Sequence, residues 1–185
     1  MQFTVTETTL PDVKVFEYRE FGDERGSFAE VYHKSLFQEH SLPDFTQQNQ
    51  SKSAKGVLRG LHFQNNPDSI AKFVRCVHGH IFDVAVDIRK SSPHYGQWFG
   101  IHLTGDDTKM LLVPDGFAHG FLTLEDNTIV NYQQSGYWSP ASERSILWSD
   151  PEIGINWPFD DIDNVELSGK DQIAVSLKDS DHNFN

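Results

Sequence analysis

Cysteine, basic residues and long apolar runs are all scarce in this chain. Cys76 is the only cysteine among 185 residues, which excludes an internal disulfide and favours a reducing compartment. The 15 Lys and Arg are outnumbered by 27 Asp and Glu, and the formal net charge of -12 disfavours binding to nucleic acid or to an anionic membrane surface. No segment reaches the roughly 20 apolar residues that span a bilayer, and residues 1–10 have no signal-peptide pattern. We therefore expect a cytoplasmic protein.

Several common catalytic motifs are also missing. The chain contains no Gly-x-Gly-x-x-Gly, no P-loop, no Gly-x-Ser-x-Gly and no Cys-x-x-Cys. Nicotinamide chemistry, phosphoryl transfer and serine hydrolysis therefore lose support. Because Lys and Arg are few, any group of them that converges on one pocket would indicate an anionic small-molecule ligand.

Turn residues recur at short intervals, which is typical of an antiparallel β protein. They lie at Gly22-Asp23, Lys55-Gly56, Asn66-Pro67-Asp68, His78-Gly79, Ser92-Pro93, Gly105-Asp106, Pro114-Asp115-Gly116, Asp126-Asn127 and Ser139-Pro140. Between turns the hydrophobic period is two, as in residues 82–89, where apolar residues alternate with Asp, Ala and Arg. The sequence predicts an all-β antiparallel jelly roll or closed barrel, with its site among the inward-facing side chains.

Helices are expected in only two short segments. Ser35–His40 precedes Pro43, and Ser168 with Asp171 forms a Ser-x-x-Asp capping box. No linker or repeat divides residues 1–185, so we expect one domain. The tail from about residue 178 is polar and is expected to fray.

An Arg and a His lie close together in the strand-like segment 59–64. His62 is a candidate base, although a half-buried strand histidine with one hydrogen bond is the commoner situation. Strict alternation would put Arg59 and His62 on opposite faces of the strand. Gly60 lies between them, and a strand glycine often marks a bulge that redirects a neighbouring side chain.

Further polar and aromatic residues are candidates that also have structural interpretations. Asp83 and Asp87 fit a solvated strand face that forms ion pairs with Lys72 and Arg75 on the preceding strand. Asp171 can be explained as a helix-capping residue as well as a functional-site residue. Aromatic residues are more often part of a core or an interface than reactive, and three follow this region: Tyr132, Tyr137 and Trp138.

Metal binding is the sharpest competing hypothesis, because small β barrels often hold a metal with histidines and a carboxylate. The spacing of the histidines does not suit a metal site. His78 and His80 flank the turn residue Gly79, and His62 is followed by Gln64 where a second imidazole would be needed. We expect no catalytic metal.

Taken together, these segments resemble the dTDP-4-dehydrorhamnose 3,5-epimerase family over nearly the whole chain, from Asp12 to Asp171. Several long blocks in the same order carry the resemblance: Gly22-Asp23-Glu24-Arg25-Gly26, Gln47 and Asn49 before Ser51, Arg59-Gly60-Leu61-His62-Phe63-Gln64, residues 82–89, Gly116-Phe117-Ala118-His119-Gly120-Phe121, and Trp148 with Asp150-Pro151. The resemblance implies a cupin-like jelly roll, a homodimer that exchanges N-terminal strands, and catalysis without metal or cofactor.

The resemblance also implies roles for individual residues. The histidine matching His62 is the base, paired with the aspartate matching Asp171, and the tyrosine matching Tyr132 is the acid. The residues that match contacts to the nucleotide sugar are Arg25, Glu30, Gln47, Asn49, Arg59, Lys72, His119, Glu143 and Lys170. Three positions depart from the common pattern, namely Gln48, Gln133 and Trp138, of which the last keeps an aromatic face on which a thymine can stack.

These roles suit proton transfer beside a ketone. A neutral histidine oriented by Asp171 can remove the proton, and Lys72, held by Asp83, can stabilise the enolate oxygen. Tyr132 can return a proton to the opposite face. The sequence leaves open whether both C3 and C5 of a dTDP-linked 4-keto-6-deoxy sugar are inverted. It is also compatible with a non-catalytic nucleotide-sugar binder and with a metal-dependent cupin enzyme.

Overall fold

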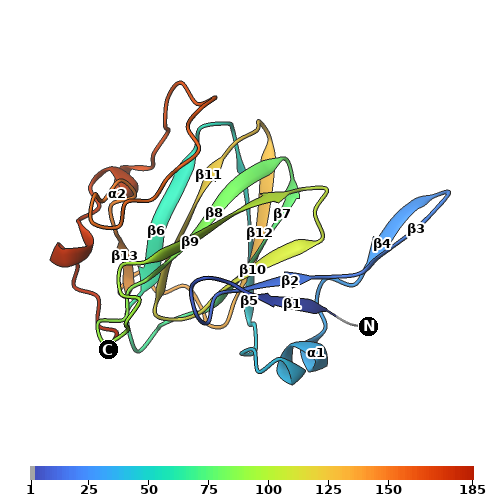
Figure 1. The fold of residues 1–185 in the computed structure, drawn as a ribbon, viewed down its shortest axis with the longest axis horizontal. Helices are drawn as coiled ribbons and strands as arrows, with labels where there is room; N and C mark the ends of the chain where they lie inside the picture. The colour runs from blue at the N-terminus through green and yellow to red at the C-terminus, as the bar shows by residue number, and fades with distance from the viewer. Residues whose placement is uncertain (1–2) are drawn as a thin grey trace.

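Two packed antiparallel sheets form the body of the protein (Figure 1). The computed structural model describes residues 3–185, apart from the side chain at position 36. The first sheet has the order β1 (Thr4–Glu7), β2 (Lys14–Glu17), β10 (Lys109–Val113), β7 (Lys72–His78), β12 (Thr128–Gln134) and β5 (Gln47–Ser53). The second has the order β13 (Glu143–Ser145), β6 (Leu58–Gln64), β11 (Phe117–Thr123), β8 (His80–Asp87) and β9 (Trp98–Thr104). The prediction of an all-β, cupin-like fold is confirmed.

Helices are short, as the sequence predicts. Helix α1 spans Lys34–Glu39 and helix α2 spans Gly169–Gln172, with a 3-10 turn η1 at Leu177–Asp179. Ser168 caps α2, because its side chain accepts the Asp171 backbone N–H. Both helix predictions are confirmed.

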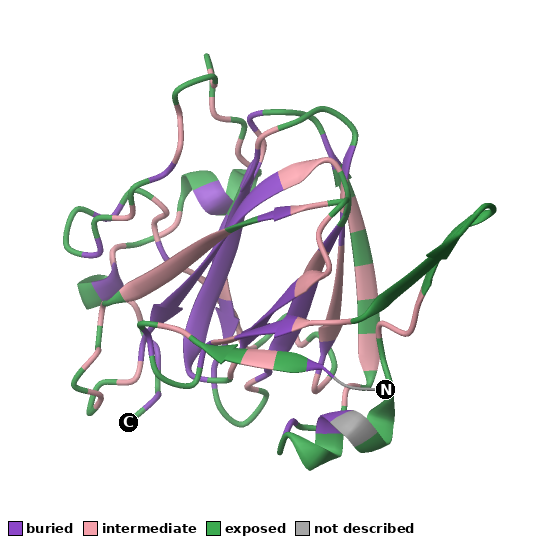
Figure 2. Cartoon of the chain, turned by 45° about the vertical axis from the view of Figure 1, so that its right-hand side comes forward, coloured by how far each residue is buried: buried purple, intermediate pink, exposed green. Residues whose placement is uncertain are grey.

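The core between the two sheets follows from the period-two pattern of their strands. Ile81 and Ala85 of β8 point inward, toward Val74 and Cys76 of β7 on the facing sheet. Figure 2 shows these buried strands at the centre of the molecule. One end of the space between the sheets is thus filled by apolar side chains, and the polar side chains of the same strands are left for the other end.

The outer faces of both sheets are also covered. Helix α1 and Phe3 pack on the outside of the six-stranded sheet, where Phe16, Phe37 and Phe73 meet edge to face or tilted. The segment from residue 146 onward covers the outside of the five-stranded sheet. Both faces of β8 are therefore covered, one by the facing sheet and one by this segment, and every residue of the strand after His80 is buried.

The expectation that Asp83 and Asp87 lie on a solvated face is wrong, because they share the face of β8 that carries Ile81 and Ala85 and points between the sheets. Both side chains are fully buried. Asp87 binds the Arg89 guanidinium at 2.6 Å and the Ser92 hydroxyl at 2.7 Å, so it holds the turn after β8. Asp83 faces inward, toward the site.

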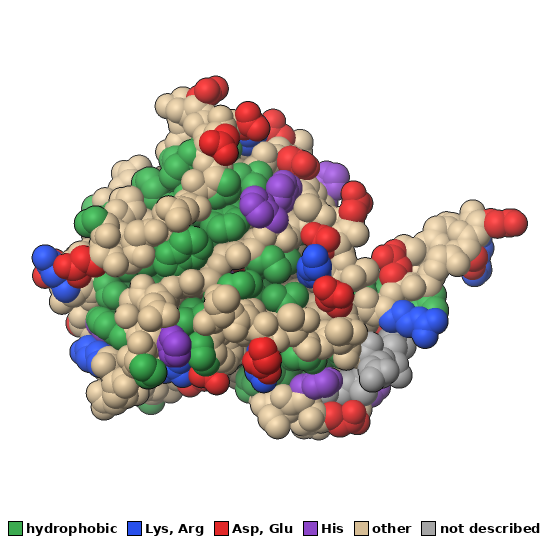
Figure 3. Space-filling model, viewed as in Figure 1, with side chains coloured by type: hydrophobic (Ala, Val, Ile, Leu, Met, Phe, Trp, Pro, Cys, Tyr) green, Lys and Arg blue, Asp and Glu red, His purple; other side chains and the backbone are tan. Residues whose placement is uncertain are grey.

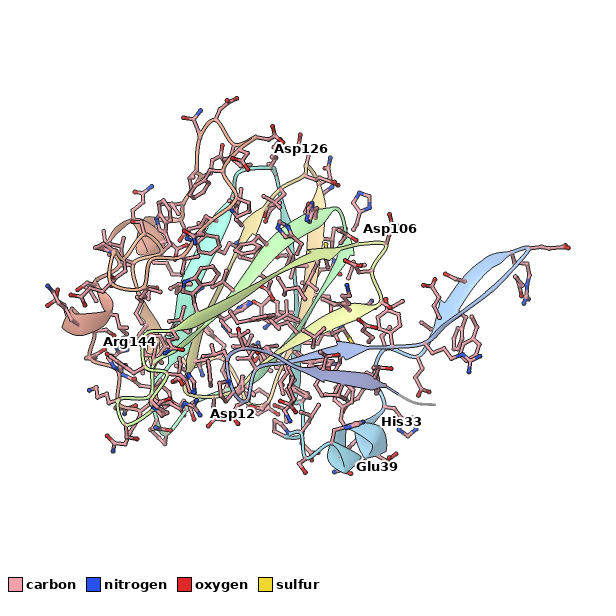
Figure 4. The ribbon with its side chains drawn as sticks, viewed as in Figure 1. Asp12, His33, Glu39, Asp106, Asp126 and Arg144 are labelled. Carbon is pink, nitrogen blue, oxygen red and sulfur yellow. The ribbon has the colours of Figure 1, made fainter. Side chains whose placement is uncertain are left out.

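The C-terminal tail packs against the barrel, so the expectation of a frayed end is wrong. Phe184 joins the apolar cluster outside the five-stranded sheet, and His182 is buried and stacked on Tyr95. Arg144 of β13 (Figure 4) binds Asp181 at 2.8 Å. Two buried side chains and the polar contacts of Asp181 and Asn183 hold this segment, and composition alone does not reveal them.

A hairpin arm of β3 (Glu20–Asp23) and β4 (Gly26–Ala29) projects from the body (Figures 1 and 3). Phe21 and Phe28 pair across it and remain exposed, at 44% and 67%. An isolated two-stranded hairpin that exposes aromatic residues is not expected to be stable in water unless a partner surface covers it.

No helix of the described residues has the length and apolarity to cross a membrane.

Candidate active site

A pocket of about 520 Å³ lies at the polar end of the space between the sheets. Its walls come from both sheets and from α2. The lining residues include all but three of the candidate site residues, namely Gln47, Asn49, Arg59, His62, Lys72, His119, Tyr132, Trp138, Glu143, Lys170 and Asp171. The structure therefore brings together residues that are up to 124 positions apart in the sequence, from Gln47 to Asp171.

A bulge in β6 places Arg59 and His62 on the same face. His119 of β11 pairs with His62, and Phe121 pairs with Arg59. Between these two pairs β6 therefore contains one more residue than β11, which is a β-bulge. Gly60 has φ of 122°, and a Cβ there would lie 2.6 Å from the Gly120 Cα. Only glycine fits this close approach of the two strands. The bulge predicted at Gly60 is confirmed.

His62 and Asp171 form a close pair at the pocket wall. His62 Nε2 lies 2.5 Å from Asp171 Oδ1, and the other carboxylate oxygen accepts the Ser168 hydroxyl at 2.7 Å. Asp171 is therefore both the capping-box residue and the partner of His62, so the two interpretations hold together. Because the Nε2–H of neutral His62 donates a hydrogen bond to the ionised carboxylate, Nδ1 is left as the basic nitrogen.

Burial lowers the pKa of His62 below its ordinary value. Hydrogen bonding and attraction to Asp171 oppose this fall, while Lys72 and Lys170 add to it. The Asp171 pKa is held low by His62 and Ser168 against the effect of burial. The pair therefore rests as a neutral imidazole beside an ionised carboxylate, which is the state that a general base needs.

Lys72 lies deep in the pocket, where burial lowers its pKa to about 8 even though Asp83 attracts the charged form. Its Nζ reaches the His62 carbonyl oxygen at 3.4 Å. Asp83 binds His119 Nε2 at 2.7 Å through one oxygen, and its other oxygen has no hydrogen-bond partner among the described residues. Lys72 and Asp83 thus lie buried behind His62 and His119. These two histidines are cross-strand neighbours.

Tyr132 lies on β12, on the wall opposite His62. Burial raises its pKa, and the Arg59 guanidinium opposes the rise. The phenol is therefore protonated at neutral pH. Its cross-strand neighbour on β5 is Asn49, which also lines the pocket.

Cationic and aromatic groups surround the pocket mouth. Lys170 of α2 binds Glu143 of β13 at 2.8 Å. Arg59 donates to the Ser53 hydroxyl at 3.1 and 3.2 Å and is otherwise exposed. Trp138 is 55% exposed, so one face of its ring is available to a ligand.

The loop that carries Trp138 is fixed by two glutamines. Gln47 accepts the Trp138 backbone N–H at 3.0 Å, and Gln64 accepts the Ser139 N–H at 2.8 Å. Gln64 also donates to the Tyr137 carbonyl at 3.2 Å. The orientation of the exposed indole is therefore set by the strands that carry the rest of the site.

The remaining candidates lie outside the pocket. Asp83 is behind it, as described. Arg25 and Glu30 belong to the projecting arm and its base, and within the described part of the chain Arg25 pairs only with Asp23. The departures Gln48 and Gln133 are cross-strand partners on the face of β5 and β12 that points away from Tyr132, and they do not line the pocket.

The sequence reasoning treated Ser168 only as a helix cap, whereas Ser168 also lines the pocket and supports Asp171. It missed Ser51 and Gln134, which line the pocket from the same sheet as Tyr132. Gln134 is two positions after Tyr132, so strand alternation gave a signal for it. Within residues 3–185 no three His, Cys, Asp or Glu side chains are grouped so that they could hold a metal ion.

Comparison with known proteins identifies the family. The family model for dTDP-4-dehydrorhamnose 3,5-epimerase matches residues 7–179. The Salmonella typhimurium enzyme of this name is 50% identical, over 94% of this chain and 94% of its own. Two similar solved structures are the Legionella pneumophila epimerase in complex with dTDP-4-keto-L-rhamnose and the Bacillus anthracis enzyme with TDP and PPi bound. Their TM-scores are 0.93 and 0.88, their identities are 40% and 44%, and they cover 97% and 94% of this chain and 95% and 98% of theirs. This chain therefore belongs to the dTDP-4-dehydrorhamnose 3,5-epimerase family.

Proposed function

We propose that this epimerase converts dTDP-4-dehydro-6-deoxy-D-glucose to dTDP-4-dehydro-L-rhamnose, the C3 and C5 inversion of dTDP-rhamnose biosynthesis. The observation that supports this most directly is the placement of the His62–Asp171 pair and Tyr132 on opposite walls of one pocket. A purely binding protein needs no such arrangement. The reaction requires no redox step and no covalent intermediate.

The first step is removal of a proton from the carbon beside the ketone. Such a carbon is acidic only because the charge moves onto the ketone oxygen as an enolate. His62 Nδ1 takes the proton, and Asp171 stabilises the imidazolium that results. The short contact to Asp171 and the low resting pKa of His62 support this role.

Lys72 stabilises the enolate oxygen. In a buried site a preorganised charge acts strongly on developing charge, and removing one such group typically costs about 3 to 4 kcal/mol of transition-state stabilisation. The Asp83 carboxylate favours the charged form of Lys72 against burial. Tyr132 then delivers a proton from the other face, and solvent reprotonates the phenolate.

The nucleotide part of the substrate lies at the cationic mouth. Arg59 suits bidentate contact to a phosphate and Lys170 suits a point-charge contact, while Trp138 offers a stacking face to thymine. Gln47, Asn49, His119 and Glu143 complete the contacts to the nucleotide sugar. Arg59 and Lys170 also explain how a protein of net charge -12 holds a diphosphate.

The reaction is tested by incubation with dTDP-4-keto-6-deoxyglucose in heavy water, with deuterium at C3 and C5 followed by NMR. We expect uptake at both carbons and a rhamnose-configured product. Uptake at one carbon would identify a single-position epimerase, and no uptake would reject the proposal. Activity that is lost on chelation and restored by a divalent metal would favour a metal-dependent enzyme.

The activity should show a bell-shaped pH profile. His62 acts as a neutral base with a lowered pKa, so kcat/KM should fall only as the pH drops below the ordinary histidine value of 6.5. Lys72 acts as a cation with a pKa of about 8, so kcat/KM should fall again as the pH rises through that value. In Lys72→Met the overall rate should be low and the fall near pH 8 absent. A wild-type profile that stays flat well above the Lys72 pKa of about 8 would remove Lys72 from the enolate site.

The active unit is a homodimer that exchanges N-terminal strands, so that the arm carrying Arg25 and Glu30 reaches the partner's pocket. The exposed Phe21 and Phe28 on the projecting arm support this. Sedimentation should give twice the 21.1 kDa chain mass.

Mixing two defective variants tests the exchange. If Arg25→Ala and His62→Ala chains are each inactive, a mixed dimer with exchanged arms contains one intact site, and about a quarter of all sites should recover after random reassociation. If each arm serves its own subunit, every site keeps one defect and no activity returns.

The protein acts in the cytoplasm. Its only cysteine, Cys76, is a free and buried thiol, which suits a reducing compartment. Cell fractionation should recover the activity with cytosolic markers, and recovery with secreted proteins would contradict this assignment.

A further inference from the structure

A chain of amide hydrogen bonds runs along the six-stranded wall of the pocket. It begins at the Trp138 backbone N–H, which donates to Gln47 Oε1 at 3.0 Å. Gln47 Nε2 then donates to Asn49 Oδ1 at 3.0 Å, and Asn49 Nδ2 donates to Gln134 Oε1 at 2.6 Å. The three side chains all line the pocket.

The direction of this chain is fixed by its first member. A backbone N–H can only donate, so Gln47 must present its oxygen to the loop and its nitrogen to Asn49. Asn49 in turn uses its oxygen and presents its nitrogen to Gln134. Each amide therefore has one allowed orientation, and Gln134 Nε2 is the last donor of the chain.

This last donor has no acceptor among the residues that the structure describes. The Gln134 side chain is buried, with 4% of the residue exposed, and its oxygen is already used by Asn49. Gln134 Nε2 is not among the fully buried unpaired side-chain atoms of the described residues, so this donor is open to the pocket. Because Gln134 lines the pocket, a ligand bound there can supply the acceptor.

The position of Gln134 indicates which part of the ligand it meets. In the sheet Gln134 is the direct cross-strand partner of Lys72 on one side and of Gln47 on the other. Side chains of such partners are neighbours, with Cβ atoms about 4.5 to 5.5 Å apart. The chain of amides thus leads from Trp138 at the mouth to the neighbourhood of Lys72 in the depth of the pocket, where the keto sugar reacts.

We propose that Gln134 is a further substrate-contacting residue, whose amide nitrogen donates a hydrogen bond to an oxygen of the sugar part of the nucleotide sugar. This inference rests on the proposed function. It adds a neutral hydrogen-bond donor that contacts the sugar and therefore favours binding of the nucleotide sugar over dTDP alone. Through Asn49 and Gln47 the same contact is linked to the loop that positions Trp138.

Two substitutions separate donation to the sugar from support of Asn49. Gln134→Glu keeps an acceptor for Asn49 but replaces the donor with a second acceptor, whereas Gln134→Met removes both. Gln133→Glu is the matched control, because it adds the same charge one residue away on the opposite face of β12. For each variant, KM and kcat are measured with dTDP-4-keto-6-deoxyglucose, and Kd is measured for dTDP by calorimetry.

At pH 8 we expect Gln134→Glu and Gln134→Met to raise KM by roughly three- to tenfold, the usual effect of one lost neutral hydrogen bond. The Kd for dTDP should stay within twofold of that of Gln133→Glu. Gln134→Glu should lose at least as much as Gln134→Met, because its carboxylate keeps an acceptor for Asn49 but sets a second acceptor against the sugar oxygen. A residue that only supports Asn49 would instead keep a near-wild-type KM in Gln134→Glu.

Two results would overturn the inference. One is a wild-type KM in Gln134→Glu, and the other is an equal loss of dTDP and substrate binding in both variants. Failure of the wild-type protein to bind dTDP or to turn over the keto sugar would instead reject the proposed function. Wild-type turnover with unaltered Gln134 variants would reject this inference alone.

Discussion

His62→Ala should abolish deuterium exchange at both C3 and C5 while it leaves dTDP binding nearly unchanged. Among the described residues of the pocket, this imidazole alone combines a free basic nitrogen with a carboxylate partner on the other nitrogen at 2.5 Å and a pKa lowered by burial. Loss of a general base typically lowers the rate by roughly 10²- to 10⁴-fold. The diphosphate contacts assigned to Arg59 and Lys170 remain, so the nucleotide should still bind.

The matched control is His119→Ala, because His119 is the direct cross-strand neighbour of His62 and also contacts an aspartate. Its imidazole is almost fully buried and points at Asp83. This variant should weaken substrate binding and keep measurable exchange at both carbons. If exchange instead survived in His62→Ala and vanished in His119→Ala, the base would be the second histidine. Nucleotide affinity measured by calorimetry on both variants shows that each protein is folded.

The sequence was sufficient to predict an antiparallel β fold, the two short helices and the bulge at Gly60. Each of these depends on local chemistry: alternation along a strand, a side-chain cap, and a glycine at a close approach of two backbones. The bulge was the decisive prediction for the site. Without the extra residue in β6, Arg59 and His62 would lie on opposite faces, and only one of them would reach the pocket.

What the sequence could not predict depends on contacts between distant segments. The period of two in residues 82–89 suggests that Asp87 lies on a polar face, yet Asp87 is buried because its face, which also carries Ile81 and Ala85, packs toward the six-stranded sheet. Tail residues 181–185 are mostly polar, yet Phe184 and His182 are buried against the body. Neither covering has a local sequence signature, since it arises from the path of the chain.

Asp171 shows how one residue can satisfy a local and a distant requirement together. The local pattern at Ser168 correctly predicts the start of α2. The cap also fixes the carboxylate, because Ser168 donates to the oxygen that does not meet His62. A helix of four residues is too short to be stable alone, so its position depends on packing against β6 and on this His62 contact.

Tyr132→Phe should separate hydrogen exchange from inversion. The substitution removes one hydroxyl from a half-buried ring, so packing, folding and substrate affinity should be preserved. Tyr132 belongs to the six-stranded wall and His62 to the five-stranded wall. With the acid removed, His62 can still form the enolate, but a proton returns readily only from the side of abstraction.

In heavy water the variant should therefore take up deuterium at C3, C5 or both with retained configuration. Epimerised product should fall by roughly 10²- to 10⁴-fold, the usual effect of a lost general acid. NMR of the recovered substrate measures exchange, and the ratio of product to deuterated substrate measures inversion. If exchange and inversion fell in parallel, Tyr132 would hold the substrate or assist deprotonation, and the proton for the second face would have to come from another group. Because burial keeps the phenol protonated through neutral pH, its loss cannot be mimicked by raising the wild-type protein to pH 8, and only the substitution tests this step.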